Sequence, residues 1–320
     1  MPATQLKTTE LGHTGLQITR LGFGAWAIGG GGWEFGWGPQ DDEQSVAAIH
    51  RGLELGINWI DTAAAYGFGR SEQIVGRALE GLSERPYVFT KCSLLEGPGR
   101  RVVHSLKRDS ILREADDSLR RLGLDAIDLY QIHWPIPVAD IEEGWAALAE
   151  LKQQGLVRHI GVSNFDVEQL RLIQQIAPVE TLQPQYSLIE RDAERELLPF
   201  AEQEGIGVIV YSPMGSGILS GGMTRERVEN MPEDDWRKRD PRFNEPALSE
   251  NLELVERLKA VAERYDTTPG AVAIAWTLRN PAVDGAIVGF RRPDQVDPLL
   301  SAASLELTDE DVAEIEGGVC

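Results

Sequence analysis

Short apolar segments alternate with longer segments of helical periodicity about eight times along the 320 residues of the chain. The apolar segments are continuous, which is typical of parallel strands that are buried on both faces. Eight such units favour a closed (β/α)8 barrel, a TIM barrel, over an open doubly wound sheet. The pattern predicts strands at 57–60, 87–90, 127–132, 157–162, near Thr181, 206–210 and 286–288. It predicts helices at 42–56, 70–81, 108–122, 140–154, 166–176, 192–204, 294–302 and from about Thr308.

The segment 6–24 differs from the rest, because apolar and polar residues alternate there on both sides of Gly12 to Gly15. This pattern predicts an N-terminal β-hairpin followed by the first barrel strand. The whole chain, 1–320, has the size of one barrel, so we expect a single domain. Segments 27–40 and 212–250 are too long for tight connections, and we expect both to be functional loops at the C-terminal face of the barrel.

The charge of the chain excludes some classes of partner. Asp and Glu total 51 against 31 Lys and Arg, a formal net charge of -20 that repels nucleic-acid phosphates and anionic lipid heads. We expect neither a nucleic-acid nor a membrane partner, and the sequence carries no signal for a metal site or an oligomeric state. The two cysteines, Cys92 and Cys320, offer no disulfide framework, and the start MPATQLKTTE lacks an apolar signal core, so we expect a cytoplasmic protein.

Four polar side chains follow consecutive predicted strands, at the rim where barrel enzymes carry catalytic groups. Asp61 ends one strand and Tyr66 follows it by five residues; Lys91 comes after the next strand and His133 after the one beyond. A phenol is a weak acid at pH 7, so it needs an ammonium that stabilises phenolate, and the ammonium needs a carboxylate. An imidazole beside the phenol can orient a carbonyl group. Each residue alone is more often structural, but four such residues at the ends of three consecutive strands indicate a catalytic set.

Several tryptophans stand in or near the long loops, where a solvated linker would not carry them. They are suited to the walls of a pocket, and we expect an aromatic, largely apolar substrate site. The substrate-binding candidates are Trp26, Trp33, Trp37 and Trp134.

The order of the motifs closely resembles the aldo-keto reductase superfamily. The motifs are D-T-A-x-x-Y-G at 61–67, T-K at 90–91, Q-I-H-W-P at 131–135, G-V-S-N-F at 161–165, Q-P-Q-Y at 183–186 and Y-S-P-M-G-S-G at 211–217. The resemblance extends from LGFGAW near the start to IVGFRRPDQV near the end. It implies reduction of a small-molecule aldehyde or ketone by hydride from NADPH, with Tyr66 as general acid, His133 positioning the carbonyl, and Lys91 and Asp61 tuning Tyr66.

The resemblance also implies the cofactor site. Ser163, Asn164 and Gln183 would hold the nicotinamide carboxamide, and Tyr211 would stack on its ring. Small residues would lie along the pyrophosphate, where glycine lets backbone N–H groups approach closely. These residues are Ser212, Met214, Gly215 and Gly217.

The segment after the last strand would bind the adenosine end. It contains Gly289, Arg291, Arg292 and Gln295, and either arginine could meet a 2'-phosphate. The other place for that contact is the loop 222–242 with its arginines Arg225, Arg227, Arg237 and Arg239. No G-x-G-x-x-G run joins a strand to a helix, which argues against a Rossmann site.

Two departures from the family's pattern concern binding and leave the catalytic positions intact. Ile136 follows H-W-P where many relatives have an acidic residue, and Pro298 with Leu299 stands where an acidic residue and an Asn often contact adenine.

Two other functions stay open. One is a non-catalytic or very slow cofactor-binding regulatory member of the same superfamily. The other is a lyase or isomerase with Lys91 as a Schiff base, which would require a neutral amine that Asp61 opposes.

Overall fold

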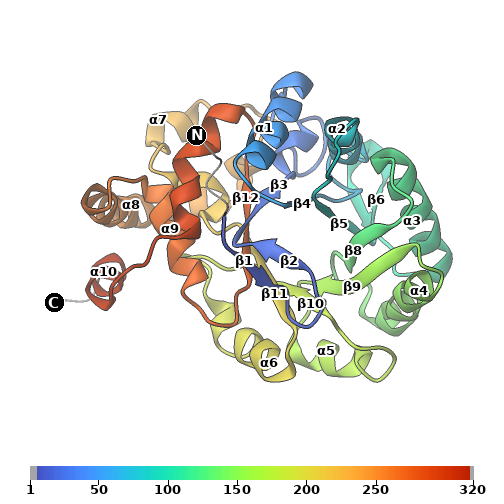
Figure 1. The fold of residues 1–320 in the computed structure, drawn as a ribbon. Helices are drawn as coiled ribbons and strands as arrows, with labels where there is room; N and C mark the ends of the chain where they lie inside the picture. The colour runs from blue at the N-terminus through green and yellow to red at the C-terminus, as the bar shows by residue number, and fades with distance from the viewer. Residues whose placement is uncertain (1–5, 318–320) are drawn as a thin grey trace.

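A computed structural model describes residues 6–317 and contains a closed barrel of parallel strands surrounded by helices (Figure 1). Around the barrel the strands follow one another in chain order, and β12 pairs with β3 to close it. The strands are β3 (Leu21–Gly24), β4 (Trp59–Asp61), β5 (Tyr87–Cys92), β8 (Ile127–Ile132), β9 (Val157–Ser163), β10 (Thr181–Gln183), β11 (Gly207–Tyr211) and β12 (Gly285–Gly289). The predicted (β/α)8 barrel is confirmed, with strand bounds shifted by up to two residues.

The helices surround the barrel, and most of them bury part of their surface. They are α1 (Asp42–Glu54), α2 (Arg70–Leu79), α3 (Arg108–Leu122), α4 (Ile141–Gln153), α5 (Val167–Ile173), α6 (Leu197–Glu204), α7 (Arg225–Glu229), α8 (Ala247–Arg264), α9 (Pro269–Leu278) and α10 (Asp309–Ile315). Side-chain caps explain several starts: Asp41 accepts a hydrogen bond from the backbone of Gln44 at α1, and Thr308 forms a capping box at α10.

The N-terminal hairpin, β1 (Thr8–Glu10) and β2 (Gln17–Thr19), lies across one end of the barrel, in front of the ring of strands in Figure 1. Its buried Leu11 and Ile18 pack against residues from inside the barrel, including the fully buried Trp59. The Trp59 indole donates a 2.8 Å hydrogen bond to the Thr19 carbonyl. The hairpin therefore forms an apolar floor, and access to the interior comes from the opposite, C-terminal face.

Gly22 of β3 is the residue that makes room for the Trp59 indole in this floor. A Cβ atom at position 22 would lie 2.2 Å from the indole, far inside van der Waals contact. The floor therefore depends on one large and one minimal side chain in neighbouring strands.

Three predictions about elements need correction. The predicted helix 294–302 is instead two 3-10 segments, Pro293–Gln295 and Asp297–Ala303, because Pro298 lacks the N–H that a continuous helix needs. The predicted loop 212–250 contains α7 and the start of α8. The predicted helix 192–204 is interrupted near Glu196, whose φ of -138° is not helical.

A second hairpin, β6 (Leu94–Glu96) and β7 (Val102–His104), stands at the C-terminal face and has no counterpart among the predicted elements. The two cysteines cannot be compared, because Cys320 lies outside the described residues. Among residues 6–317, none of the helices combines the length and the apolar character needed to cross a bilayer.

Candidate active site

The four predicted catalytic residues lie together at the C-terminal end of the barrel. Lys91 Nζ is 2.5 Å from Asp61 Oδ1, 3.0 Å from the Thr62 carbonyl oxygen and 3.4 Å from Tyr66 Oη. The rings of Tyr66 and His133 meet edge to face with centroids 5.6 Å apart. The Lys91 ammonium thus lies between the Asp61 carboxylate and the Tyr66 hydroxyl, as expected from its position at the end of the neighbouring strand.

Burial dominates the electrostatics of this group. It raises the pKa of Asp61 and lowers the pKa of Lys91, and the contact between the two groups counteracts both shifts. Burial, with the nearby Lys91 ammonium, also holds the pKa of His133 well below its usual range, so the imidazole is neutral at pH 7. A neutral imidazole has one N–H donor and can therefore donate a hydrogen bond to a carbonyl oxygen.

One expectation about these charges is reversed. The residue types suggest that Lys91 would favour phenolate, but burial and the charge of Asp61 raise the pKa of Tyr66 well above 10. The main physical reason is the burial of the phenol; in addition, Asp61 accompanies Lys91, so the pair presents little net positive charge to the phenol. The phenol therefore keeps its proton at neutral pH.

A hydrogen-bonded network from the next strands surrounds the catalytic group. Gln183 Nε2 donates to Asp61 Oδ2 at 2.9 Å, and Ser163 Oγ donates to the Gln183 carbonyl at 2.7 Å. Asn164 donates to the His133 carbonyl at 2.9 Å and accepts from the Tyr211 hydroxyl at 2.8 Å. The predicted carboxamide-binding residues and Tyr211 are therefore held in place by the same bonds that orient the catalytic side chains.

The segment after β11 has a backbone suited to an anion. Ser212, Gly215, Ser216 and Gly217 all have positive φ angles, between 55° and 92°, and such turns direct consecutive N–H groups to one side. Ser216 Oγ is buried and has no hydrogen-bond partner among the described residues. An unpartnered buried hydroxyl beside such a turn fits the phosphate groups of a dinucleotide.

These groups line one large cavity of about 870 Å³ at the C-terminal face. Asp61, Tyr66 and His133 are in its wall, whereas Lys91 lies behind Tyr66. The predicted binding residues in its wall are Trp26, Trp33, Trp37, Trp134, Ser163, Asn164, Gln183, Tyr211, Ser212, Met214, Gly217, Gly289, Arg291 and Gln295. Gly215 and Arg292 do not line it.

The two long loops meet over this cavity through their tryptophans. Trp26 stacks on Trp236 with centroids 5.0 Å apart, and Trp37 contacts both rings edge-on. The Arg237 guanidinium lies over the Trp37 ring at 4.4 Å, and Trp37 pairs with Asp235 as an isolated bridge. Loop residues some two hundred positions apart in sequence thus form one wall.

The arginines are not equivalent. Arg227, Arg237, Arg242 and Arg291 line the cavity. Asp235 pairs with Arg237 at 2.6 Å and Asp240 with Arg242 at 2.5 Å, whereas Arg227 and Arg291 form no ion pair with any described residue. Arg292 instead pairs with Asp294 at 3.1 Å and is exposed. Within the other loop, Arg225 pairs with Glu245 and Arg239 donates to the Glu34 carbonyl.

Some residues of the cavity wall have no signal in the sequence. His104 reaches it from the hairpin β6–β7, which was not predicted, and burial lowers the pKa of His104. Ser216 and Arg242 come from the loop after β11, where only the glycines and other arginines attract attention. Pro298 and Leu299, the departures from the family's adenine pattern, also line the cavity.

Comparisons with known proteins agree with this geometry. The model of the aldo/keto reductase family matches residues 20–318. The aldo-keto reductase YhdN of Bacillus subtilis (strain 168) is 39% identical over 313 residues, 97% of this chain and 92% of that protein. The NADH-specific methylglyoxal reductase of Escherichia coli (strain K12) is 36% identical over 322 residues, 96% of each protein.

A solved structure gives the same answer for the fold. The glycerol dehydrogenase AKR11B4 from Gluconobacter oxydans is 37% identical and superposes with a TM-score of 0.86, covering 99% of this chain and 95% of that one. The resemblance found in the motifs is therefore confirmed over nearly the whole length. The chain belongs to the aldo-keto reductase family, oxidoreductases that use nicotinamide cofactors.

Proposed function

We propose that the protein reduces an aldehyde or ketone to the alcohol with NADPH, and that Tyr66 is the general acid. The observation that carries the proposal is the position of Lys91 Nζ, within 3.4 Å of the Tyr66 hydroxyl and 2.5 Å of Asp61, directly behind the cavity wall. A phenol held in this way can donate its proton to a carbonyl oxygen as negative charge develops there.

Each residue then has one task. Tyr66 stays protonated until the carbonyl oxygen becomes basic, and the neutral His133 donates a hydrogen bond that fixes the same oxygen. Ser163, Asn164 and Gln183 would hold the nicotinamide carboxamide, and Tyr211 would cover one face of the ring. The bound cofactor would supply the hydride, so the carbonyl carbon gains the hydride and its oxygen gains the Tyr66 proton.

The cofactor preference is the finer part of the proposal, since a relative is named NADH-specific. Arg291 supports NADPH, because its half-buried guanidinium lines the adenosine side of the cavity beside Gln295 and Pro298. A charge-assisted contact with the 2'-phosphate contributes about 1.5–3 kcal/mol, or about tenfold to a hundredfold in affinity.

The test of the chemistry is the oxidation of NADPH and NADH, followed by absorbance, with methylglyoxal, glyceraldehyde and an aromatic aldehyde. Methylglyoxal and glyceraldehyde are related to the compounds for which two relatives are named, and the aromatic aldehyde suits the tryptophans that line the cavity. Tyr66→Phe should lower turnover by roughly a hundredfold to ten-thousandfold while NADPH affinity stays within twofold. Full activity of Tyr66→Phe would refute the assignment, and absence of turnover in the wild type would favour a cofactor-binding regulator.

The test of the cofactor preference compares two neighbouring arginines. Arg291→Ala should reduce the ratio of NADP+ to NAD+ affinity by about tenfold or more, whereas Arg292→Ala, which removes a residue outside the cavity wall, should leave it unchanged. Isothermal titration gives both affinities without requiring a substrate. An unchanged ratio in Arg291→Ala would move the phosphate contact to Arg227 or Arg237.

A further inference from the structure

Pro39 and Gln40, at the end of the long loop 27–40, hold the Arg291 side chain in a fixed conformation, although they are more than 250 positions away in the sequence. We propose that Gln40 is a positioning residue that orients the Arg291 guanidinium and thereby sets the preference for a cofactor with a 2'-phosphate. The proposal rests on the proposed function, because it requires Arg291 to be the phosphate contact. Gln40 would extend the cofactor site to a second segment of the chain, and no motif in the sequence indicates this residue.

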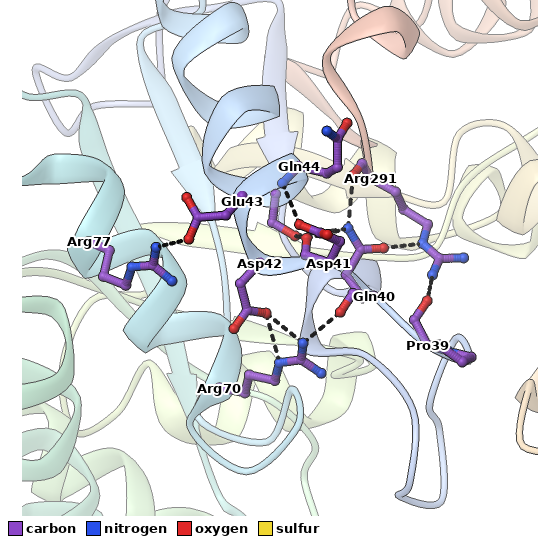
Figure 2. Close-up of polar contacts among 10 residues, drawn as sticks. Pro39, Gln40, Asp41, Asp42, Glu43, Gln44, Arg70, Arg77 and Arg291 are labelled. Atoms are coloured by element: carbon purple, nitrogen blue, oxygen red, sulfur yellow. Dashed lines mark hydrogen bonds and ion pairs between the residues drawn. The ribbon is translucent and has the colours of Figure 1, made fainter.

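The contact between Gln40 and Arg291 is reciprocal, as Figure 2 shows. Gln40 Oε1 accepts a hydrogen bond from Arg291 Nε at 2.6 Å, and Gln40 Nε2 donates to the Arg291 carbonyl at 2.8 Å. Arg291 Nη2 also donates to the carbonyl of Pro39 at 2.5 Å. One amide therefore fixes both the side chain and the main chain of Arg291.

These bonds leave one part of the guanidinium open. Nε and Nη2 are bound by loop 27–40, while Nη1 has no partner among the described residues. Burial and the neighbouring Arg237 lower the pKa of Arg291, while Asp235 raises it. No carboxylate of the described residues forms an ion pair with Arg291, whereas Asp294 pairs with Arg292 at 3.1 Å. A guanidinium with one free edge, in a cavity that Arg227 also lines, is suited to an anionic ligand.

Gln40 is itself held on its other side. Its side-chain nitrogen Nε2 also donates to Ser45 Oγ at 2.8 Å, and its backbone carbonyl accepts from Arg70 Nη2 at 2.8 Å. Arg70 is in turn paired with Asp42 at 2.5 Å, at the first residue of α1 (Figure 2). Contacts within the chain therefore hold the pose of Arg291, and a side chain that is already positioned loses less entropy when it binds a ligand.

The experiment measures the affinities of NADP+, NAD+ and 2',5'-ADP for the full-length protein by titration calorimetry. Gln40→Ala should weaken NADP+ and 2',5'-ADP by roughly threefold to tenfold, the range of a lost hydrogen bond, and change NAD+ by less than twofold. The turnover number at saturating NADPH should stay unchanged, so that the effect falls on KM. Gln73→Ala is the matched control, because Gln73 is exposed on α2 and is not among the described residues lining the cavity.

A second variant separates position from charge. Gln40→Glu keeps an acceptor for Arg291 Nε but places a negative charge beside it, so NADP+ should be weakened more than in Gln40→Ala. Equal weakening of NADP+ and NAD+ by Gln40→Ala would overturn the proposal in favour of a purely structural role. An unchanged affinity ratio in Gln40→Ala, with a reduced ratio in Arg291→Ala, would overturn it while the proposed function stands. An unchanged ratio in Arg291→Ala itself would overturn this inference and move the phosphate contact of the proposed function to Arg227 or Arg237.

Discussion

Lys91→Met tests whether the buried pair Lys91–Asp61 is held together by charge. Lys91 is 1% exposed and Asp61 2% exposed, and the substitution keeps a linear side chain of similar length while removing the ammonium. The Asp61 carboxylate would retain its bond from Gln183 but lose the 2.5 Å contact that offsets its burial. Breaking a buried ion pair on one side costs about 3–5 kcal/mol, a large part of the roughly 5–15 kcal/mol that stabilises a typical domain.

The effect has a definite pH dependence. Without Lys91, burial raises the pKa of Asp61 further than in the wild type, so the folded state favours the protonated carboxyl. A raised folded pKa contributes stability below the unfolded value of about 4, and that stability is lost as pH rises through the folded value. Lys91→Met should therefore become more stable, relative to the wild type, as the pH falls from 8 to 5.

Urea unfolding followed by circular dichroism at pH 5, 6, 7 and 8 measures both effects. The control is the double variant Lys91→Met, Asp61→Asn, which has no carboxyl at this place and can still accept the Gln183 hydrogen bond. At pH 8 it should be more stable than Lys91→Met alone. Equal stability of the two variants at every pH would refute the reasoning that an uncompensated carboxylate is the cause.

Two further outcomes concern stability. Burial raises the pKa of Glu114, a residue of α3, to about 7. The wild type should therefore lose about 2.5 kcal/mol of unfolding free energy between pH 5 and 8 relative to Glu114→Gln, and parallel pH profiles from urea titrations would contradict this. Gly22→Ala should destabilise the barrel by about 1–3 kcal/mol or more, because its Cβ would meet the Trp59 indole at 2.2 Å. Adding Trp59→Leu should cost less in the Gly22→Ala background than in the wild type, as measured by a double-mutant cycle.

The strand pattern predicts the catalytic group because strands and rims are local features. Asp61 ends an apolar run and Lys91 lies at the end of the next, so the closed parallel barrel alone brings them together. Their proximity follows from the pairing of the two strands, so it can be predicted from the strand pattern without knowing the conformation of any loop. The direction of the Tyr66 pKa shift could not be predicted, since it depends on how completely the phenol is buried.

The predicted elements omit α8, although its buried residues recur at helical spacing, and two elements that lack a periodic signal. α9, with the sequence PGAVAIAWTL, is buried on every side and shows no amphipathic stripe, so its pattern does not differ from that of an apolar loop or strand. The hairpin β6–β7 is short and largely exposed, without the alternation that marks a half-buried sheet. His104 was missed with it, because a side chain cannot be assigned to a cavity before its element is known.

The link between Gln40 and Arg291 was invisible for another reason. The two residues are 251 positions apart, and neither spacing nor composition connects an amide in one loop with an arginine in another. Only the pairing of β12 with β3 brings their segments side by side. Contacts between loops of distant strands are thus the part of the site that requires the structure.

The pairing of the first barrel strand with the last has a consequence for the order of assembly during synthesis. Leu21 of β3 pairs with Ala286 of β12, so more than 260 residues must be synthesised before β3 meets this partner. Such long-range pairing forms slowly. A nascent chain that already contains Asp61, Tyr66, Lys91 and His133 still lacks Arg291 and β12, the strand that precedes it and places it near Gln40. The proposed catalytic residues can therefore be synthesised long before Arg291, and the proposed contact of Arg291 with a 2'-phosphate requires that the ring of strands has closed.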